Sequence, residues 1–222
     1  MAENILLVEG DYDKEFIQRF CDSSLGVNAI KVQVLTPKGI GVAQNGWRSI
    51  TDNLSIPLKK LAIGDIDKFG IMLDADYSPN NSGGFSSRYK LITAKLKLHN
   101  YVIPDQPNLG NGDIFKHNNG LAAIGLWIMP DHRNDGMIEA FIEKMIATNV
   151  DQQALLVHAN KTVTTTLPVT LFNKAIHTTK SKVLTWLAWQ KKPGQLHINL
   201  TNGVFDRNKV ANFETWLKST FL

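Results

Sequence analysis

The sequence contains little cysteine and no long apolar run, and both shortages limit what kind of protein it encodes. Cys21 is the single cysteine among 222 residues, so no internal disulfide framework exists and a reducing cytoplasm is the expected compartment. The longest apolar segment, residues 121–129, is much shorter than the roughly 20 residues of a membrane-spanning helix. The N-terminus shows no basic segment followed by an apolar one, so we expect no secretory signal. These features predict a cytoplasmic protein without a membrane segment.

The common signatures of cofactor sites are missing as well. The six histidines are scattered, without the spacing of zinc ligands. No G-x-G-x-x-G motif follows the first expected strand, and no phosphate-binding loop motif occurs. Zinc sites and nucleotide-cofactor sites of those kinds are therefore not expected.

Positive charge is concentrated in the last third of the chain. Residues 1–154 contain 15 Lys and Arg against 18 Asp and Glu, whereas residues 155–222 contain 9 against 2. An acidic part followed by a basic part is typical of a metal site beside a surface that binds a polyanion. The other interpretation, in which the lysines only keep the protein dispersed, fits the counts equally well.

Strand-like and helix-like segments alternate through the first 150 residues. Short apolar runs predict strands, and apolar residues at every third or fourth position predict helices. The expected strands are residues 4–8, 30–35, 69–76 and 121–129, with short antiparallel pieces at 101–104 and 112–115; the expected helices follow Asp13 and cover 48–61, 86–99, 136–146, 183–190 and 208–221. This alternation predicts an α/β domain over residues 1–150, with a mainly parallel sheet flanked by helices. Residues 151–222 are expected to form a basic, mainly helical extension packed on it.

Acidic residues follow the expected strands at the points where the strands end. Glu9 ends the first strand, and Asp74 and Asp76 end the third with Ala75 between them. Because side chains alternate along a strand, Asp74 and Asp76 are expected to point the same way. The carboxyl ends of parallel strands meet at one edge of a sheet, and oxygen ligands select Mg²⁺ or Mn²⁺ over zinc. The alternative is an exposed turn that happens to be acidic.

Two further acids are weaker candidates for the same site. Asp131 follows the strand expected at residues 121–129, and Glu139 lies in the first turn of the next helix. The alternatives make Asp131 a turn residue and Glu139 an acid that stabilises the positive end of the helix dipole. Asp13 is interpreted differently, as the N-cap of the first helix.

The order of these motifs resembles the Toprim domain of topoisomerases, bacterial primases and related nucleases. There the first strand ends in Glu-Gly followed by a nearby acid and the third ends in Asp-x-Asp; here the two elements are Glu9-Gly10-Asp11-Tyr12-Asp13 and Asp74-Ala75-Asp76. The resemblance implies an acid–base or metal-binding role for Glu9 and metal binding by Asp74 and Asp76. Segments at residues 127–131, 136–139 and 185–190 are similar to a small bacterial family of stand-alone Toprim-like proteins without an assigned function.

The chain departs from topoisomerases in lacking a domain with a catalytic tyrosine, and from primases in lacking a zinc-binding module. Among the activities that the resemblance implies, Mg²⁺-dependent cleavage of nucleic acid therefore fits best, because it needs no further domain. The candidate phosphate-binding residues are Arg88, Lys90, Lys180, Lys182, Lys191 and Lys192. Two alternatives stay open: a non-catalytic nucleic-acid-binding or defence protein, and a small-molecule phosphohydrolase. A homo-oligomer or an activating partner protein is compatible with each of them.

Overall fold

The computed structural model describes residues 2–35, 46–78, 83–195, 200 and 203–222. In this part of the chain a five-stranded sheet has the order β2-β1-β3-β5-β4. Strands β2, β1, β3 and β5 are parallel, and β4 is antiparallel to β5. The strands are β1 (Glu3–Val8), β2 (Lys31–Val34), β3 (Ile66–Asp74), β4 (Asp113–Phe115) and β5 (Ile124–Met129). The expected α/β class with a mainly parallel sheet is confirmed.

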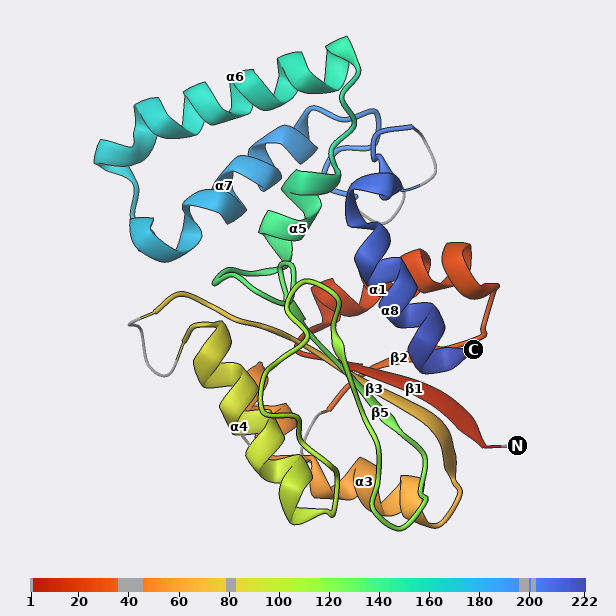
Figure 1. The fold of residues 1–222 in the computed structure, drawn as a ribbon. Coiled ribbons are helices and arrows are strands. Elements are labelled where there is room, and N and C mark those ends of the chain that lie inside the picture. Colours follow the sequence, from red (N-terminus) through yellow and green to blue (C-terminus); the bar gives the residue numbers. More distant parts are fainter. Residues whose placement is uncertain (1, 36–45, 79–82, 196–199, 201–202) are drawn as a thin grey trace.

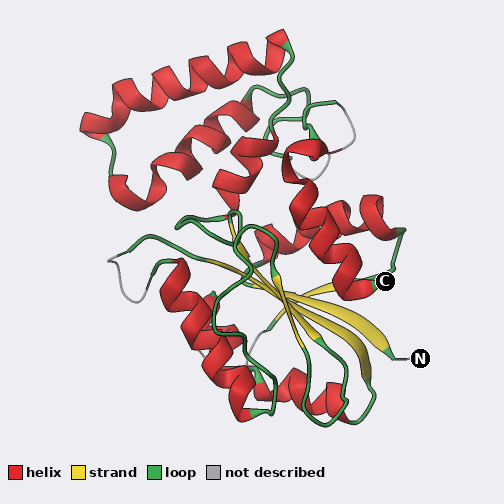
Figure 2. Cartoon of the chain, in the orientation of Figure 1, coloured by secondary structure: helices red, strands yellow, loops and turns green. Residues whose placement is uncertain are grey.

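Helices cover both faces of this sheet (Figures 1 and 2). The helices are α1 (Asp11–Leu25), α2 (Trp47–Asn53), α3 (Ser55–Ala62), α4 (Phe85–Leu98), α5 (Ile138–Met145), α6 (Val150–Thr166), α7 (Lys174–Ala188) and α8 (Ala211–Phe221), with short 3-10 turns η1 (Leu167–Val169) and η3 (Arg207–Val210). Helices α1 and α8 lie on one face, and α2, α3 and α4 lie on the other (Figure 1). None of the described helices is long and apolar enough to cross a membrane.

The alternation of side chains along the strands divides the interior into two cores. Leu6 and Met72 belong to the core under α1 and α8, whereas Leu7 and Ile71 belong to the core under α2, α3 and α4. Every residue of β5 is buried, as expected for a strand with both faces covered. The sheet register aligns Leu7 with Ile71 and Asp74 with Met129, so the carboxyl ends of β1, β3 and β5 lie at one edge.

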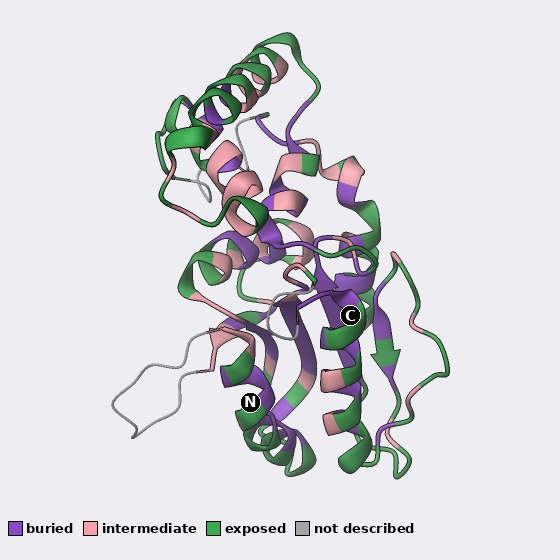
Figure 3. Cartoon of the chain, turned by 90° about the vertical axis from the view of Figure 1, so that its left-hand side faces the viewer, coloured by how far each residue is buried: buried purple, intermediate pink, exposed green. Residues whose placement is uncertain are grey.

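The C-terminal segment divides into two parts that differ in packing. Helices α6 and α7 form a hairpin that projects beyond the sheet, and much of its surface is exposed (Figures 1 and 3). Helix α8 instead packs on β3 and β5. Glycine permits this close approach, because a Cβ atom at Gly125 would lie 2.4 Å from the Thr220 hydroxyl and one at Gly70 would lie 2.9 Å from the Phe221 ring. The end of the expected extension therefore belongs to the same core as the sheet.

Several expected element boundaries differ from the structure, and α7 begins at Lys174 instead of Val183. The third strand ends at Asp74 and does not include Asp76. The expected helix 48–61 is divided into α2 and α3 at Leu54, and Pro57 lies in the first turn of α3, where the missing N–H costs little. Asp13 is not an N-cap: α1 begins at Asp11 after Gly10, and no side chain caps it.

Candidate functional site

Glu9 and Asp74 meet at the carboxyl edge of the sheet, as their positions after β1 and at the end of β3 predict. Oε1 of Glu9 accepts a hydrogen bond of 2.8 Å from the backbone N–H of Asp74. Oδ1 of Asp74 accepts one of 2.9 Å from the N–H of Ile138, the first residue of α5. Among the described residues, no hydrogen bond reaches the second oxygen of either carboxylate. One oxygen of each carboxylate is therefore fixed by a backbone hydrogen bond, and the other oxygen accepts no hydrogen bond from a described residue.

Two more acids join this pair from the helices that pack above it. Asp13 lies in the first turn of α1, and Glu139, which is 1 % exposed, lies in the first turn of α5. The negative charges of both raise the pKa of Asp74. We refer to Glu9, Asp13, Asp74 and Glu139 as the acidic cluster. Glu139 was a candidate from the sequence, whereas Asp13 was assigned to a cap, although it stands in the same Glu9–Asp13 motif as the strand-end glutamate.

Burial is the main reason why the pKa values of these acids are high. It raises the pKa of Glu9 to about 8, helped by the charges of Asp76 and Asp13 and opposed by the backbone hydrogen bond from Asp74. It also raises the pKa of Asp74, and the largest contribution from a neighbouring charge is that of Glu9. Carboxylates brought together in a partly dry site repel one another, so each takes up a proton more readily.

The pKa of Asp13 rises to about 6, because burial and the charge of Glu139 outweigh the attraction of Lys180. Lys180, on α7, is the cation that pairs with Glu139 and lies close enough to affect Asp13. Its Nζ atom lies 2.9 Å from Oε1 of Glu139 and 5.9 Å from the centre of the Tyr12 ring. Burial alone would lower the pKa of Lys180, but the hydrogen bond to Glu139 and the charges of Asp13 and Asp74 raise it. The α6–α7 hairpin therefore contributes one positive charge to the acidic cluster.

Asp76 lies next to the cluster but is held by a different cation. It has a left-handed backbone, with φ of 59°, and pairs with Gly136 in an isolated antiparallel bridge. Its carboxylate forms an ion pair with Arg88, whose side chain is 1 % exposed and lies 4.0 Å from the centre of the Trp47 ring. The argument that Asp76 points the same way as Asp74 assumed an unbroken strand, and this assumption is wrong. The charge of Asp76 nevertheless raises the pKa values of Glu9 and Asp74.

Asp131 lies outside the acidic cluster. Its two carboxylate oxygens accept hydrogen bonds from the backbone N–H and the side-chain amide of Asn134, at 2.9 and 2.7 Å. It lines a separate pocket beside Trp127 and Phe141. The structure thus supports the alternative in which Asp131 orders a turn.

The six candidate phosphate-binding residues do not form one group. Arg88 is buried against Asp76 and Lys180 is paired with Glu139. Lys90 is exposed on α4, Lys182 is partly exposed on α7, and Lys191 and Lys192 are exposed just after α7. Two of the expected phosphate ligands therefore neutralise acids instead.

Among the described residues, no group of three or more His, Cys, Asp or Glu side chains is arranged closely enough to hold a metal ion. The acidic cluster nevertheless has the donor chemistry of a magnesium site, because its ligands are all carboxylate oxygens. A divalent cation would relieve the repulsion that raises the pKa values of Glu9 and Asp74. To bind one, the side chains would have to close on the ion through the oxygens that Glu9 and Asp74 leave without hydrogen bonds.

Fold and site together define an α/β protein with acidic residues gathered at the carboxyl edge of a mainly parallel sheet. The chain belongs to the family described as protein of unknown function DUF3226, whose model matches residues 3–222. The match extends over the sheet, the α6–α7 hairpin and α8, so all of them belong to the family architecture. No curated protein and no solved structure matches the chain significantly.

Proposed function

We propose that this protein is a Mg²⁺- or Mn²⁺-dependent phosphodiesterase that cleaves nucleic acid, with its metal site at the acidic cluster. The observation that carries the proposal is the meeting of Glu9 and Asp74, which strands β1 and β3 bring together in a partly buried site, and this burial raises the pKa of both. The sequence resemblance to Toprim nucleases points to the same chemistry. A cytoplasmic location remains part of the proposal.

In this proposal Glu9 and Asp74 hold the ion through their second oxygens, with Asp13 and Glu139 supplying further negative charge. A bound Mg²⁺ would stabilise charge on the scissile phosphate and lower the pKa of a water molecule. Without an ion the pKa of Glu9 is about 8, so binding of the ion would release the proton of Glu9 and leave a carboxylate ligand. Lys180 would release Glu139 when the ion enters, and its ammonium group would then be available to a phosphate oxygen.

A second candidate is a nucleic-acid-binding protein without catalytic activity. The observation that favours it is that Arg88 and Lys180 already neutralise Asp76 and Glu139. In that case the two cations take the place of a metal ion, and the basic residues of the C-terminal part bind phosphate without cleaving it.

The test is a cleavage assay with single-stranded DNA, duplex DNA and RNA, in Mg²⁺ or Mn²⁺ and in EDTA. We expect metal-dependent cleavage that Asp74→Asn and Glu9→Gln each reduce by at least a hundredfold, because they remove ligands of the ion. Asp67→Asn is the matched control: Asp67 is an exposed residue on the same strand as Asp74 and should keep full activity.

Binding measured against salt concentration separates the alternatives. Each phosphate neutralised on duplex DNA adds about −0.9 to the slope of log K against log salt concentration. Salt-dependent binding without turnover would favour the second candidate. The absence of salt-dependent binding to any polynucleotide, together with hydrolysis of p-nitrophenyl phosphate, would replace both by a small-molecule phosphohydrolase.

A further inference from the structure

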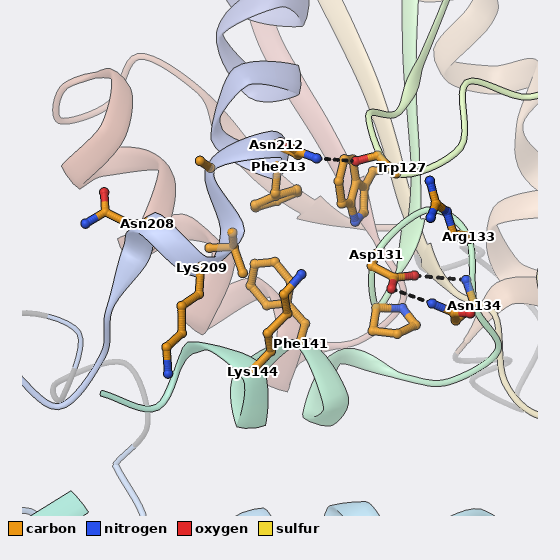
Figure 4. Close-up of a pocket in the computed structure, with 14 residues that line it drawn as sticks. Trp127, Asp131, Arg133, Asn134, Phe141, Lys144, Asn208, Lys209, Asn212 and Phe213 are labelled. Carbon is orange, nitrogen blue, oxygen red and sulfur yellow. Dashed lines mark hydrogen bonds between the residues drawn. The ribbon is translucent and has the colours of Figure 1, made fainter. Parts of the chain in front are cut away.

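A pocket on the α1–α8 side of the molecule contains no residue of the acidic cluster and is lined by aromatic and basic side chains. It lies between α5, the loop after β5 and the start of α8, and its volume is about 260 Å³ (Figure 4). Its apolar walls include the rings of Trp127, Phe141 and Phe213. These rings pack against one another, with centroid distances of 5.1 Å from Phe213 to each of the other two. Each ring is only 1–2 % exposed, so no more than a ring edge lines the pocket.

The indole N–H of Trp127 is a buried hydrogen-bond donor without an acceptor. Trp127 is 2 % exposed, and no described residue accepts a hydrogen bond from its Nε1 atom. The two other buried tryptophans are satisfied: Nε1 of Trp186 donates to Gln152 at 3.1 Å, and Nε1 of Trp216 donates to the carbonyl oxygen of Asp113 at 3.3 Å. In Figure 4 the Trp127 nitrogen lies on the side of the ring that faces Phe141 and Asp131, toward the interior of the pocket. Buried donors are rarely left unsatisfied, so a ligand with an acceptor here would gain a hydrogen bond that no described residue supplies.

The charges around the pocket favour an acceptor that is negative. Its lining includes the cations Arg133, Lys144 and Lys209 and one acid, Asp131. Both oxygens of Asp131 are occupied by Asn134, and Nζ of Lys209 donates to the carbonyl oxygen of Ile146 at 2.6 Å. Lys144 forms no ion pair with any described residue, and Figure 4 shows its side chain extending past Phe141 toward Trp127. An anionic group between Lys144 and Trp127 would satisfy both.

We propose that this pocket binds a small organic anion. Its carboxylate or phosphate accepts the hydrogen bond from Nε1 of Trp127 and pairs with Lys144, while its apolar part packs against the exposed edge of the pocket at Ala211. Hydrogen bonds that involve an ionised partner are stronger than neutral ones, so the charged group provides most of the specificity. The site is distinct from the acidic cluster, and its occupancy does not depend on a metal there.

The test uses the indole N–H signals of the ¹⁵N-labelled protein in NMR spectra, which Trp127→Phe assigns by removing one of them. The probes are phenyl phosphate and benzoate, with benzyl alcohol as the uncharged counterpart. We expect saturable shifts of the Trp127 signal with at least one anion and none with benzyl alcohol. Lys144→Gln should weaken anion binding about tenfold, whereas Lys97→Gln, a change at an exposed residue of α4, should leave it unchanged.

Three results would overturn the proposal. The first is a Trp127 signal that no anion shifts, which would mean that water alone satisfies the donor. The second is an equal shift with benzyl alcohol, and the third is equal anion affinity in the Lys144→Gln protein. Because Lys144 is exposed, its replacement is not expected to unfold the protein, so a negative result remains interpretable.

Discussion

The buried carboxylate of Asp113 and the partly buried acidic cluster lie at different places in this protein, and they differ in how their charge is satisfied. Asp113 of β4 is 5 % exposed and is fully surrounded by partners: Nε2 of His132 lies 2.9 Å from its Oδ2, and the N–H of Asn108 donates to its Oδ1 at 3.2 Å. His132 is itself fixed, because its Nδ1 accepts a hydrogen bond of 3.0 Å from the N–H of Ile128. In the acidic cluster Glu9 and Asp74 each accept one backbone hydrogen bond and face one another.

If the proposed function holds, the difference separates an acid that stabilises the fold from acids that bind a ligand. A buried carboxylate whose oxygens are all bonded to donors stabilises the fold and gains nothing from a ligand. Carboxylates that repel one another and keep free oxygens destabilise the fold until a proton or a cation binds. Burial of acids is therefore a weak sign of function by itself, whereas burial combined with unsatisfied oxygens is a stronger one.

The largest expected effect comes from removing the satisfied acid. Asp113→Ala should lower the free energy of unfolding by about 3 kcal/mol, because the buried ring N–H of His132 loses its acceptor. Denaturant unfolding followed by circular dichroism measures this loss.

Asp74→Asn is the counterpart in the acidic cluster. It keeps an acceptor for Ile138 and removes a repelled charge, so without metal its stability at pH 8 should equal or exceed that of the original protein. Losses of similar size in the Asp113 and Asp74 variants would contradict the distinction between the two groups.

A smaller effect is expected at Lys180, the cation between the α6–α7 hairpin and the cluster. Lys180→Gln should cost about 1 kcal/mol in EDTA, because Glu139 loses its counter-ion while the lysine end is 45 % exposed and partly screened by water. Mg²⁺ should stabilise this variant more than the original protein, since the ion then meets no competing ammonium group. Lys182→Gln, on the same helix, is the control; an equal response to Mg²⁺ in both variants would remove Lys180 from the site.

A further expected effect is a change in pH dependence. The pKa of Glu9 rises from 4.5 to about 8 on folding, so between these values the folded state binds more protons than the unfolded state. Stability from this group is therefore complete below pH 4.5 and is lost as the pH rises toward 8. Glu9→Gln should flatten the decline of the melting temperature between pH 6 and 8, measured in EDTA. Glu3→Gln, at an exposed residue of β1, should not flatten it.

The sequence predicted the part of the fold that depends on periodicity. Runs such as residues 4–8 and 124–129 are apolar because the strands are covered on both faces, and their alternation with amphipathic helices is sufficient to predict a mainly parallel sheet. Helix α6 was not predicted individually, because it buries only Ala159 and Val163 and lacks an apolar stripe. The return of α8 to the sheet depends on small residues of distant strands, Gly70 and Gly125, which no local pattern connects to it.

The site residues at the ends of strands could be predicted from the sequence. Those that helices bring to the cluster could be predicted less well. Glu9 and Asp74 follow from the rule that parallel strands end at one edge. Asp76 departs from the expectation because its left-handed backbone ends the alternation of side chains. Asp13 and Lys180 reach the cluster through the packing of α1 and α7, which depends on tertiary contacts that the spacing of residues does not encode.

The central claim is that the acidic cluster is a cation site, and Mn²⁺ soaked into crystals tests it most directly. Manganese scatters anomalously, so its position can be identified without reference to the protein atoms. If the acidic cluster binds a cation, we expect an anomalous peak between the carboxylates of Glu9 and Asp74. This peak should disappear in Asp74→Asn crystals treated in the same way. Crystals that show no peak there at saturating Mn²⁺, while Lys180 stays on Glu139, would contradict it.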